Sequence, residues 1–303
     1  MQKWLGFFNV GMAAVLVAFL FASNAGEENG TVDIEKTDAL PQVIRPVSLE
    51  KPFDFAGESL PMGNFDVRQR LDRELISNSY RHSNTILYLK SMYQYFPAIE
   101  KIFKENGLPE DFKYLAVAES GLANETSPAG AKGFWQFMTA TAKYYGLEIN
   151  AQVDERYHLE KATRAACSYL KDYYKQFGSW TFAAAAYNMG GPNLKKSIEQ
   201  QKGATYYDLN LNVETNRYIF RIVALKEIMS DPEKYGFYLD TSEGYPPLDE
   251  YKEIEVNKSI ADLGQFAIDN GTTYRMLKVY NPWLISSALT NNSGKTYTIR
   301  LPL

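Results

Sequence analysis

The sequence predicts a mainly α fold, in which a helical domain precedes a small βααβ module. Three observations carry this prediction. From about residue 65 to residue 235, apolar residues recur at three- and four-residue spacing, the period of a helix that packs through one face. That region shows no alternation of strands and helices and no internal repeat. After residue 250 the pattern changes to strand, helix, helix and strand.

The helical region begins at FDVRQRLDREL, where Asp66 is the predicted N-cap. The apolar stripe of this first helix consists of Val67, Leu71 and Leu75. A second helix is expected at about 85–95, and Pro97 is expected to open a third that stops near Gly107. Further helices are predicted for about 140–145, 161–177, 180–187 (capped by Ser179) and 213–229.

The stretch YLAVAESGL places an acid at the end of an apolar helix. Pro109 fits the first helical position and Gly121 the C-terminal cap, so this helix ends near Glu119. Phe112 and Leu115 share the helix face of Glu119, which predicts that this face is buried. Burial and the negative end of the helix dipole both raise the pKa of a carboxyl group. The residues alone leave two hypotheses: a satisfied structural acid, or a working acid for glycosidic bond cleavage.

Composition narrows the function classes. The net charge of -4 over 303 residues gives no reason to expect nucleic acid as a partner. The chain has two histidines and a single cysteine, Cys167, so it forms no internal disulfide and a His/Cys metal site is not expected. Carboxylate metal sites stay open, although the sequence has no calcium-loop pattern. We predict neither a metal nor a cofactor.

The N-terminus is typical of a secreted protein. Lys3 precedes an apolar run over residues 4–22, and small residues follow it up to Gly26. This pattern predicts a signal peptide over residues 1–25, with cleavage after Ala25. An uncleaved membrane anchor is the alternative, because the run is nearly long enough to span a bilayer. Both place the remaining chain in an extracytoplasmic compartment.

The rest of the chain divides by composition. Residues 26–64 mix Pro, Gly and charges without sustained periodicity, which indicates a linker or N-terminal arm. Residues 65–235 form the predicted helical domain. A second linker covers 236–250, and the module covers 251–303.

Five blocks follow one another in the helical region: YLAVAESGL, SPAGAKGFWQFMTATAKYYGL, DERYHLEKATRAACSYL, FAAAAYNMGGPNL and ETNRYIFRIVALKEIM. In this order they resemble the lytic transglycosylases of bacterial cell walls, of the membrane-bound lytic murein transglycosylase D type. The resemblance implies a lysozyme-like (SLT) catalytic domain of the goose-lysozyme kind, in glycoside hydrolase family 23. It also implies peptidoglycan glycan strands as the partner, and a periplasmic or envelope location in a Gram-negative bacterium.

The resemblance implies roles for eight residues. Glu119 matches the family's single catalytic acid/base. The other matches are to residues that bind or face the glycan: Ser127, Gln136, Met138, Tyr187, Asn188, Glu214 and Tyr218. From the residues alone, both tyrosines are also compatible with core packing, and Gln136 and Asn188 with satisfied buried amides. We expect Trp135 and Phe137 to be packing residues.

The implied reaction uses one carboxyl group, whereas a typical glycosidase uses two. Glu119 first protonates the glycosidic oxygen between N-acetylmuramic acid and N-acetylglucosamine. It then acts as base on the muramoyl 6-hydroxyl, which attacks the anomeric carbon of its own ring. The product carries a 1,6-anhydromuramic acid end, and no water is consumed. An internal nucleophile gains from proximity, which lessens the need for a second carboxylate.

Some positions depart from the family pattern. Thr139, Phe134 and the pair His158–Leu159 replace the usual residues in loops and packing positions. The segment 251–303 resembles LysM, a peptidoglycan-binding βααβ fold, but its usual Gly-Asp-Ser/Thr opening is replaced by VNKS. The matching positions include Ile260, Leu263, Leu277 and Asn281. Glycan binding by this module and mere packing on the catalytic domain both stay open.

Two alternative functions also stay open. A lysozyme-type hydrolase on the same fold would need a carboxylate that orients water, for which Asp111, Glu125 and Asp154 are candidates. A non-catalytic peptidoglycan-binding protein would bind glycan without cleaving it. Membrane association through the N-terminal segment follows if that segment stays uncleaved.

Overall fold

The computed structural model describes residues 46–303. The predicted signal peptide or anchor, and the first part of the predicted arm, lie outside the described residues. Within 46–303, no helix combines the length and the apolar character needed to cross a membrane.

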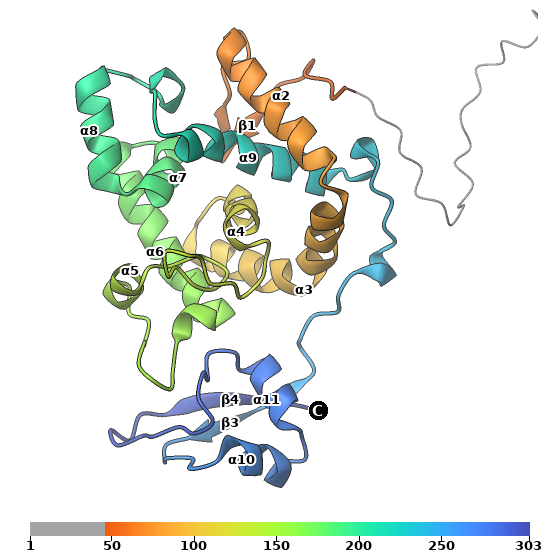
Figure 1. The fold of residues 1–303 in the computed structure, drawn as a ribbon, viewed down its shortest axis with the longest axis vertical. Coiled ribbons are helices and arrows are strands. Elements are labelled where there is room, and N and C mark those ends of the chain that lie inside the picture. The colour runs from red at the N-terminus through yellow and green to blue at the C-terminus, as the bar shows by residue number, and fades with distance from the viewer. Residues whose placement is uncertain (1–45) are drawn as a thin grey trace, which may run out of the picture. The chain divides into compact units, whose positions relative to one another are not determined.

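A helical domain and a small C-terminal module make up the described part of the chain (Figure 1). The helical domain contains the strands β1 (Asp54–Phe55) and β2 (Glu58–Ser59) and the helices α2 (Phe65–Ser79), α3 (His82–Asn106), α4 (Lys113–Ser120), α5 (Thr139–Tyr144), α6 (Leu159–Phe177), α7 (Trp180–Met189), α8 (Gly191–Gln201) and α9 (Val213–Ser230). Short 3-10 turns lie at Glu110–Phe112, Glu155–Tyr157, Tyr206–Asp208, Glu233–Tyr235 and Thr241–Glu243. The mainly α prediction is confirmed.

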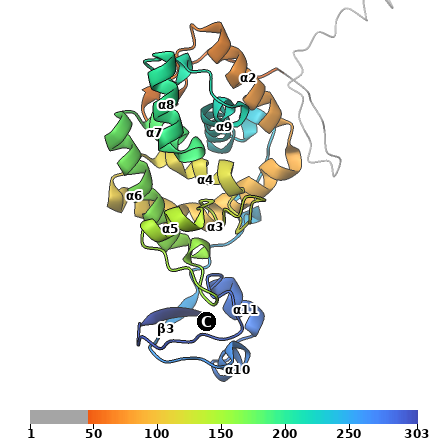
Figure 2. The ribbon, with the colours of Figure 1, turned by 60° about the vertical axis from the view of Figure 1, so that its left-hand side comes forward.

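The short helix α4 lies in the middle of this domain, with the longer helices around it (Figures 1 and 2). It packs against α9 and α3, while α2 lies along α9 and α6 lies between α3 and α7. The core runs through all of these helices. The predicted stripe of α2 is fully buried at Val67, Leu71 and Leu75, because it is the face that meets α9.

Several predicted helix ends are confirmed by their caps. Gly107 and Gly178 follow α3 and α6 with left-handed backbone (φ 62° and 70°), a conformation that glycine adopts without steric cost. The Ser179 hydroxyl accepts a hydrogen bond from the Phe182 N–H at the start of α7. These signals are local, which is why the sequence displays them.

Three details of the helical prediction are wrong. Asn64, and not Asp66, caps α2, since the Asn64 side chain accepts from the Asp66 N–H. The predicted helices before and after Pro97 form one continuous helix, α3, because buried residues on both sides of Pro97 hold it against the core. Pro109 precedes a 3-10 turn that leads into α4, so it does not occupy the first position of that helix. Helix α8 has no counterpart among the predicted elements.

The later part of the predicted arm is structured. Phe53, Phe55 and Leu60 are buried in the helical core, and β1 pairs with β2 in antiparallel fashion. The Glu58 carboxylate accepts hydrogen bonds from the backbone N–H groups of Trp180 (2.6 Å) and Thr181 (2.9 Å) at the start of α7. A carboxylate is favourable there because a helix N-terminus carries partial positive charge.

The C-terminal module has the predicted βααβ order. Its elements are β3 (Tyr251–Val256), α10 (Leu263–Asp269), α11 (Tyr274–Tyr280) and β4 (Tyr297–Pro302). Strands β3 and β4 are antiparallel, with Tyr251 opposite Pro302 and Val256 opposite Tyr297. The module has its own apolar cluster, which includes Leu263 and Leu277.

Candidate active site

Glu119 lies at the last turn of α4, and Gly121 ends that helix with a φ of 63°. Phe112 and Leu115 on the same face are completely buried, as predicted. The Glu119 side chain is half-buried, and its Oε1 accepts a hydrogen bond from the Tyr218 hydroxyl of α9. No ion pair to Glu119 occurs among residues 46–303. The acid therefore has a neutral donor beside it and no cation in direct contact.

The surroundings raise the pKa of the Glu119 carboxyl to about 7. Burial is the largest cause, because it penalises the charged form. The hydrogen bond from Tyr218 and the charge of Arg221 act in the opposite direction, while the negative charge of Glu214 adds to the rise. At neutral pH this carboxyl therefore holds its proton in a substantial fraction of molecules.

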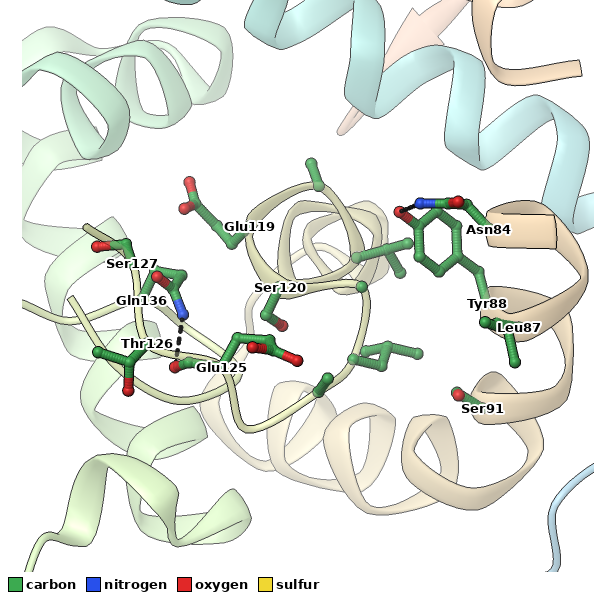
Figure 3. A pocket seen from close by; sticks show the side chains of 15 residues that line it. Asn84, Leu87, Tyr88, Ser91, Glu119, Ser120, Glu125, Thr126, Ser127 and Gln136 are labelled. Atoms are coloured by element: carbon green, nitrogen blue, oxygen red, sulfur yellow. Dashed lines mark hydrogen bonds between the residues drawn. The ribbon is translucent and has the colours of Figure 1, made fainter. Parts of the chain in front are cut away.

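Glu119 faces a cleft of about 560 Å³ (Figure 3). The cleft is lined by the end of α4, the loop at 121–127, Gln136 and one face of α3. Ser127 and Gln136 lie on the same side of α4 as the Glu119 carboxyl in Figure 3, whereas Asn84 and Tyr88 lie on the opposite side. Three of the eight predicted site residues, Glu119, Ser127 and Gln136, thus line one cleft.

The loop at 125–139 is held by its own hydrogen bonds. The Ser127 hydroxyl accepts from the Ala131 N–H (3.0 Å), and the Gln136 amide donates to the carbonyl oxygens of Glu125 (3.2 Å) and Gly133 (2.9 Å). The Ser120 hydroxyl donates to the Phe134 carbonyl oxygen (2.9 Å), which ties the loop to α4. The Gln136 amide group therefore has its hydrogen-bond partners inside the loop, as expected if it is a satisfied structural amide.

Tyr187 does not line the cleft, but it lies close enough to Glu119 for the two groups to interact electrostatically. Its hydroxyl donates to the Trp135 carbonyl oxygen (2.5 Å). Burial raises its pKa far above the ordinary tyrosine value, and the charge of Glu119 adds to this rise. Tyr218 is similarly affected and is 2% exposed. Both tyrosines therefore stay neutral; Tyr218 donates to Glu119, Tyr187 donates to Trp135, and both also pack in the core.

Asn188 and Glu214 form a separate polar cluster at the ends of α7 and α9. The Asn188 amide donates to Glu214 Oε1 (3.2 Å), and its oxygen accepts from the Thr215 hydroxyl (2.7 Å). Met138 is 47% exposed at the start of α5. These three residues do not appear in the lining of the cleft at Glu119. Trp135 and Phe137 are buried, as predicted for packing residues.

One wall of the cleft belongs to α3 and was not predicted from the sequence; it is formed by Asn84, Leu87, Tyr88 and Ser91. Leu87 is 51% exposed, which is unusual for leucine on a packed helix. Tyr88 closes against Gly121, where an added Cβ would lie 2.6 Å from the tyrosine ring. The available signal was the run ILYLKSMYQY, whose apolar residues occupy more than one helix face.

The three candidate second carboxylates lie in different surroundings. Asp111 accepts hydrogen bonds from Lys226 Nζ (2.7 Å) and from the Ala56 N–H (2.7 Å). Asp154 is 1% exposed and pairs with Arg156. Glu125 is exposed and lines the same cleft as Glu119. Within residues 46–303, no group of three His, Cys, Asp or Glu side chains is arranged to hold a metal ion.

Comparison with protein families finds two matches in this chain. Residues 96–210 match the family model "Transglycosylase SLT domain", and residues 252–303 match "Soluble lytic transglycosylase C-terminal LysM-like domain". The first match includes Glu119, Ser127 and Gln136 but begins after the α3 residues that line the cleft, and the second match covers the module. They confirm the resemblance drawn from the sequence blocks.

A curated relative is the membrane-bound lytic murein transglycosylase D of Escherichia coli strain K12. It is 28% identical over 254 residues, which are 81% of this chain and 54% of the relative. The chain thus spans about half the length of that relative.

Among solved structures, the 70 kDa soluble lytic transglycosylase of Escherichia coli aligns with 56% of this chain and 32% of its own, at 19% identity and a TM-score of 0.41. The soluble lytic transglycosylase of Pseudomonas aeruginosa, solved as an inactive mutant, aligns with 61% and 36%, at 17% identity and the same TM-score.

Proposed function

We propose that this chain, which carries a transglycosylase SLT domain over residues 96–210 and a LysM-like domain over residues 252–303, is a peptidoglycan lytic transglycosylase. The bond cleaved is the β-1,4 bond between N-acetylmuramic acid and N-acetylglucosamine, and the product ends in 1,6-anhydromuramic acid. The observation that carries the proposal is Glu119, which lines the cleft and whose carboxyl pKa is raised to about 7.

Glu119 acts first as an acid. Its proton passes to the glycosidic oxygen, the bond from that oxygen to the muramoyl anomeric carbon breaks, and Glu119 becomes a carboxylate. A pKa near the working pH suits a group that must both give and take a proton. The hydroxyl of Tyr218 stabilises the carboxylate once it forms, because the hydrogen bond to Oε1 favours the charged state.

Glu119 then acts as a base. It removes the proton of the muramoyl 6-hydroxyl, whose oxygen forms a bond to the anomeric carbon of the same ring. The acid is thereby regenerated, and no water enters the product. Because the nucleophile belongs to the substrate, the protein has only to orient the ring. We assign this orientation to Ser127 and Gln136 in the cleft, and to Met138, Tyr187, Asn188 and Glu214 beside it.

The remaining assignments complete the proposal. The domain at 65–235 is catalytic, the module at 251–303 is LysM-like, and 236–250 connects them. We place the protein in the cell envelope of a Gram-negative bacterium, exported by the segment at 1–25. The name of the Escherichia coli relative includes "membrane-bound", which supports an envelope location for this chain.

The test is mass spectrometry of the soluble products that the purified protein releases from peptidoglycan sacculi. Muropeptides one water lighter than their hydrolysed counterparts, without a reducing end, support the transglycosylase. Reducing muropeptides indicate a lysozyme-type hydrolase instead. Protein that stays bound to sacculi without releasing products indicates a non-catalytic binding protein.

A variant of Glu125 further distinguishes the transglycosylase from the lysozyme-type hydrolase. As an exposed carboxylate of the same cleft, Glu125 is the candidate for orienting water in a hydrolase. The transglycosylase needs no such group, so Glu125→Gln should keep cleavage within about threefold of the wild-type rate, whereas a general base contributes about 10²–10⁴-fold. A loss of that size in initial-rate measurements would favour the hydrolase.

A further inference from the structure

The C-terminal module is joined to the helical domain through the loop at 147–158, between α5 and α6. Val153 of this loop is fully buried inside the apolar cluster of the module. The Asp154 N–H donates to the Trp283 carbonyl oxygen, and the Ile285 N–H donates to the Gln152 carbonyl oxygen, both at 2.9 Å. The loop therefore pairs with the module as a short antiparallel bridge between Val153 and Leu284.

Side chains strengthen this junction. The Gln152 amide donates to the Thr290 hydroxyl (3.1 Å), and its oxygen accepts from the Thr290 N–H (2.6 Å). The Tyr297 hydroxyl donates to Glu148 Oε1 (2.9 Å). Main-chain pairing, a shared apolar cluster and reciprocal amide contacts together indicate a fixed docking of the module on this loop.

The same loop holds the segment that carries Ser127 and Gln136. Arg156 follows Val153 by three residues, and its side chain is 4% exposed. Its Nη1 donates to the carbonyl oxygens of Gly130 and Phe137, both at 3.2 Å, and to the Thr139 hydroxyl at 3.1 Å. One guanidinium therefore ties together two distant points of the loop at 125–139.

Asp154 fixes that guanidinium from the other side. Its Oδ1 accepts from Arg156 Nε (2.8 Å), and its Oδ2 accepts from Nη2 (2.7 Å), which is a two-point contact with a defined orientation. The backbone fits equally closely, because an added Cβ at Gly133 would lie 2.0 Å from the Arg156 carbonyl oxygen. A displacement of the loop at 147–158 must therefore also displace the loop at 125–139.

We propose that the C-terminal module positions the cleft, acting through Val153, Asp154 and Arg156 on the loop at 125–139. Arg156 is then a positioning residue for Ser127 and Gln136. This inference rests on the proposed transglycosylase function. The module then has a role other than binding peptidoglycan itself. Because it supports the cleft of the helical domain, it affects the binding of a short, soluble glycan that does not reach the module.

The experiment compares two variants of the full chain with the wild type. Val153→Ser weakens the packing of this side chain in the apolar cluster of the module. Arg156→Lys keeps a positive charge beside Asp154 but removes the planar guanidinium that bonds Asp154 and the loop at 125–139 at several points. The substrate is a soluble, uncrosslinked oligosaccharide of alternating N-acetylglucosamine and N-acetylmuramic acid. Both variants should raise KM about tenfold, since subsite residues are misplaced. Because Glu119 lies on α4, outside the displaced loop, the pH dependence of kcat/KM should stay that of the wild type.

Arg275→Ala is the matched control, since Arg275 is exposed on α11 of the module. It should leave KM unchanged. A second measurement compares amide hydrogen exchange in the wild type and in Gln152→Ala, which loses only the contacts with Thr290. Exchange of residues 125–139 should be faster in the variant. The inference is overturned if both main variants keep the wild-type KM, or if exchange in 125–139 does not respond. A wild type without cleavage would instead refute the proposed function.

Discussion

The end of α4 and the loop at 147–158 each hold a carboxyl group, half-buried at Glu119 and fully buried at Asp154, and the two carboxyl groups have opposite partners. Asp154 meets Arg156 through two hydrogen bonds and has Lys132 Nζ at 3.6 Å, so its charge is matched. Glu119 meets the hydroxyl of Tyr218, and burial raises its pKa to about 7. A paired carboxylate is a fixed structural ion, whereas an unpaired one near neutrality can exchange its proton.

The largest effect is expected from removing the exchangeable proton. Glu119→Gln keeps the shape of the side chain but cannot deliver a proton, so release of soluble muropeptides from sacculi should fall by at least about 10³-fold. The circular dichroism spectrum should remain that of the wild type. Cleavage at more than a few per cent of the wild-type rate would refute the assignment of Glu119.

The same variant has a stability signature. The folded-state pKa of Glu119, about 7, exceeds the ordinary value of 4.5, so the unfolded chain ionises first as pH rises. The free energy of unfolding of the wild type therefore falls between pH 4.5 and 7, and the loss is complete above that range. Glu119→Gln should be more stable at pH 8 by about 1–3 kcal/mol, with no gain at pH 4. Urea unfolding at both values measures this, with Glu125→Gln as the exposed control.

The second effect concerns stability and tests the ion pair between Asp154 and Arg156. Arg156→Met leaves Asp154 buried with only the more distant Lys132, and breaking a buried pair in this way costs about 3–5 kcal/mol of stability. Urea unfolding at pH 7 measures the change. The double variant Asp154→Asn, Arg156→Met should recover part of the loss, because no isolated charge remains. An Arg156→Met variant as stable as the wild type would show that Asp154 is not held as described.

A third effect is the pH dependence of cleavage. Since Glu119 must enter the reaction protonated, kcat/KM should fall about tenfold per pH unit above the pKa of about 7. Initial rates on soluble glycan between pH 5 and 9 give the midpoint. A midpoint near 4.5, the ordinary glutamate value, would mean that burial does not hold the proton on this group.

The smallest effect concerns the neighbour of Glu119. Tyr218→Phe removes the hydrogen bond that lowers the pKa of Glu119, so the alkaline midpoint of activity should move to higher pH. The maximal rate should fall about threefold to tenfold, because the carboxylate loses its donor. Tyr187→Phe is the matched control, since that hydroxyl donates to the Trp135 carbonyl oxygen. Equal midpoints in the two variants would contradict the role given to Tyr218.

Sequence reasoning succeeded where the signal is local. The face of Phe112, Leu115 and Glu119 follows from helix periodicity, and the end of α4 follows from Gly121. It failed at Pro97, where tertiary packing continues a helix that proline would weaken in isolation. It also assigned residues 46–64 to a linker, although Phe53 and Phe55 complete the core. Those two aromatics are too few to create a periodic signal.

By itself, the sequence determined the helical class, the βααβ module and the acid at the end of α4, because periodicity and caps act within a few residues. Only the tertiary structure decided which side chains meet. Tyr218 reaches Glu119 across 99 residues of chain, and Asn84 and Tyr88 of α3 form the far wall of the cleft. The sequence left packing of the module on the catalytic domain as one alternative, but only the structure identifies Val153 as the residue buried in the module. Contacts between distant segments depend on how whole helices pack, which no local pattern encodes.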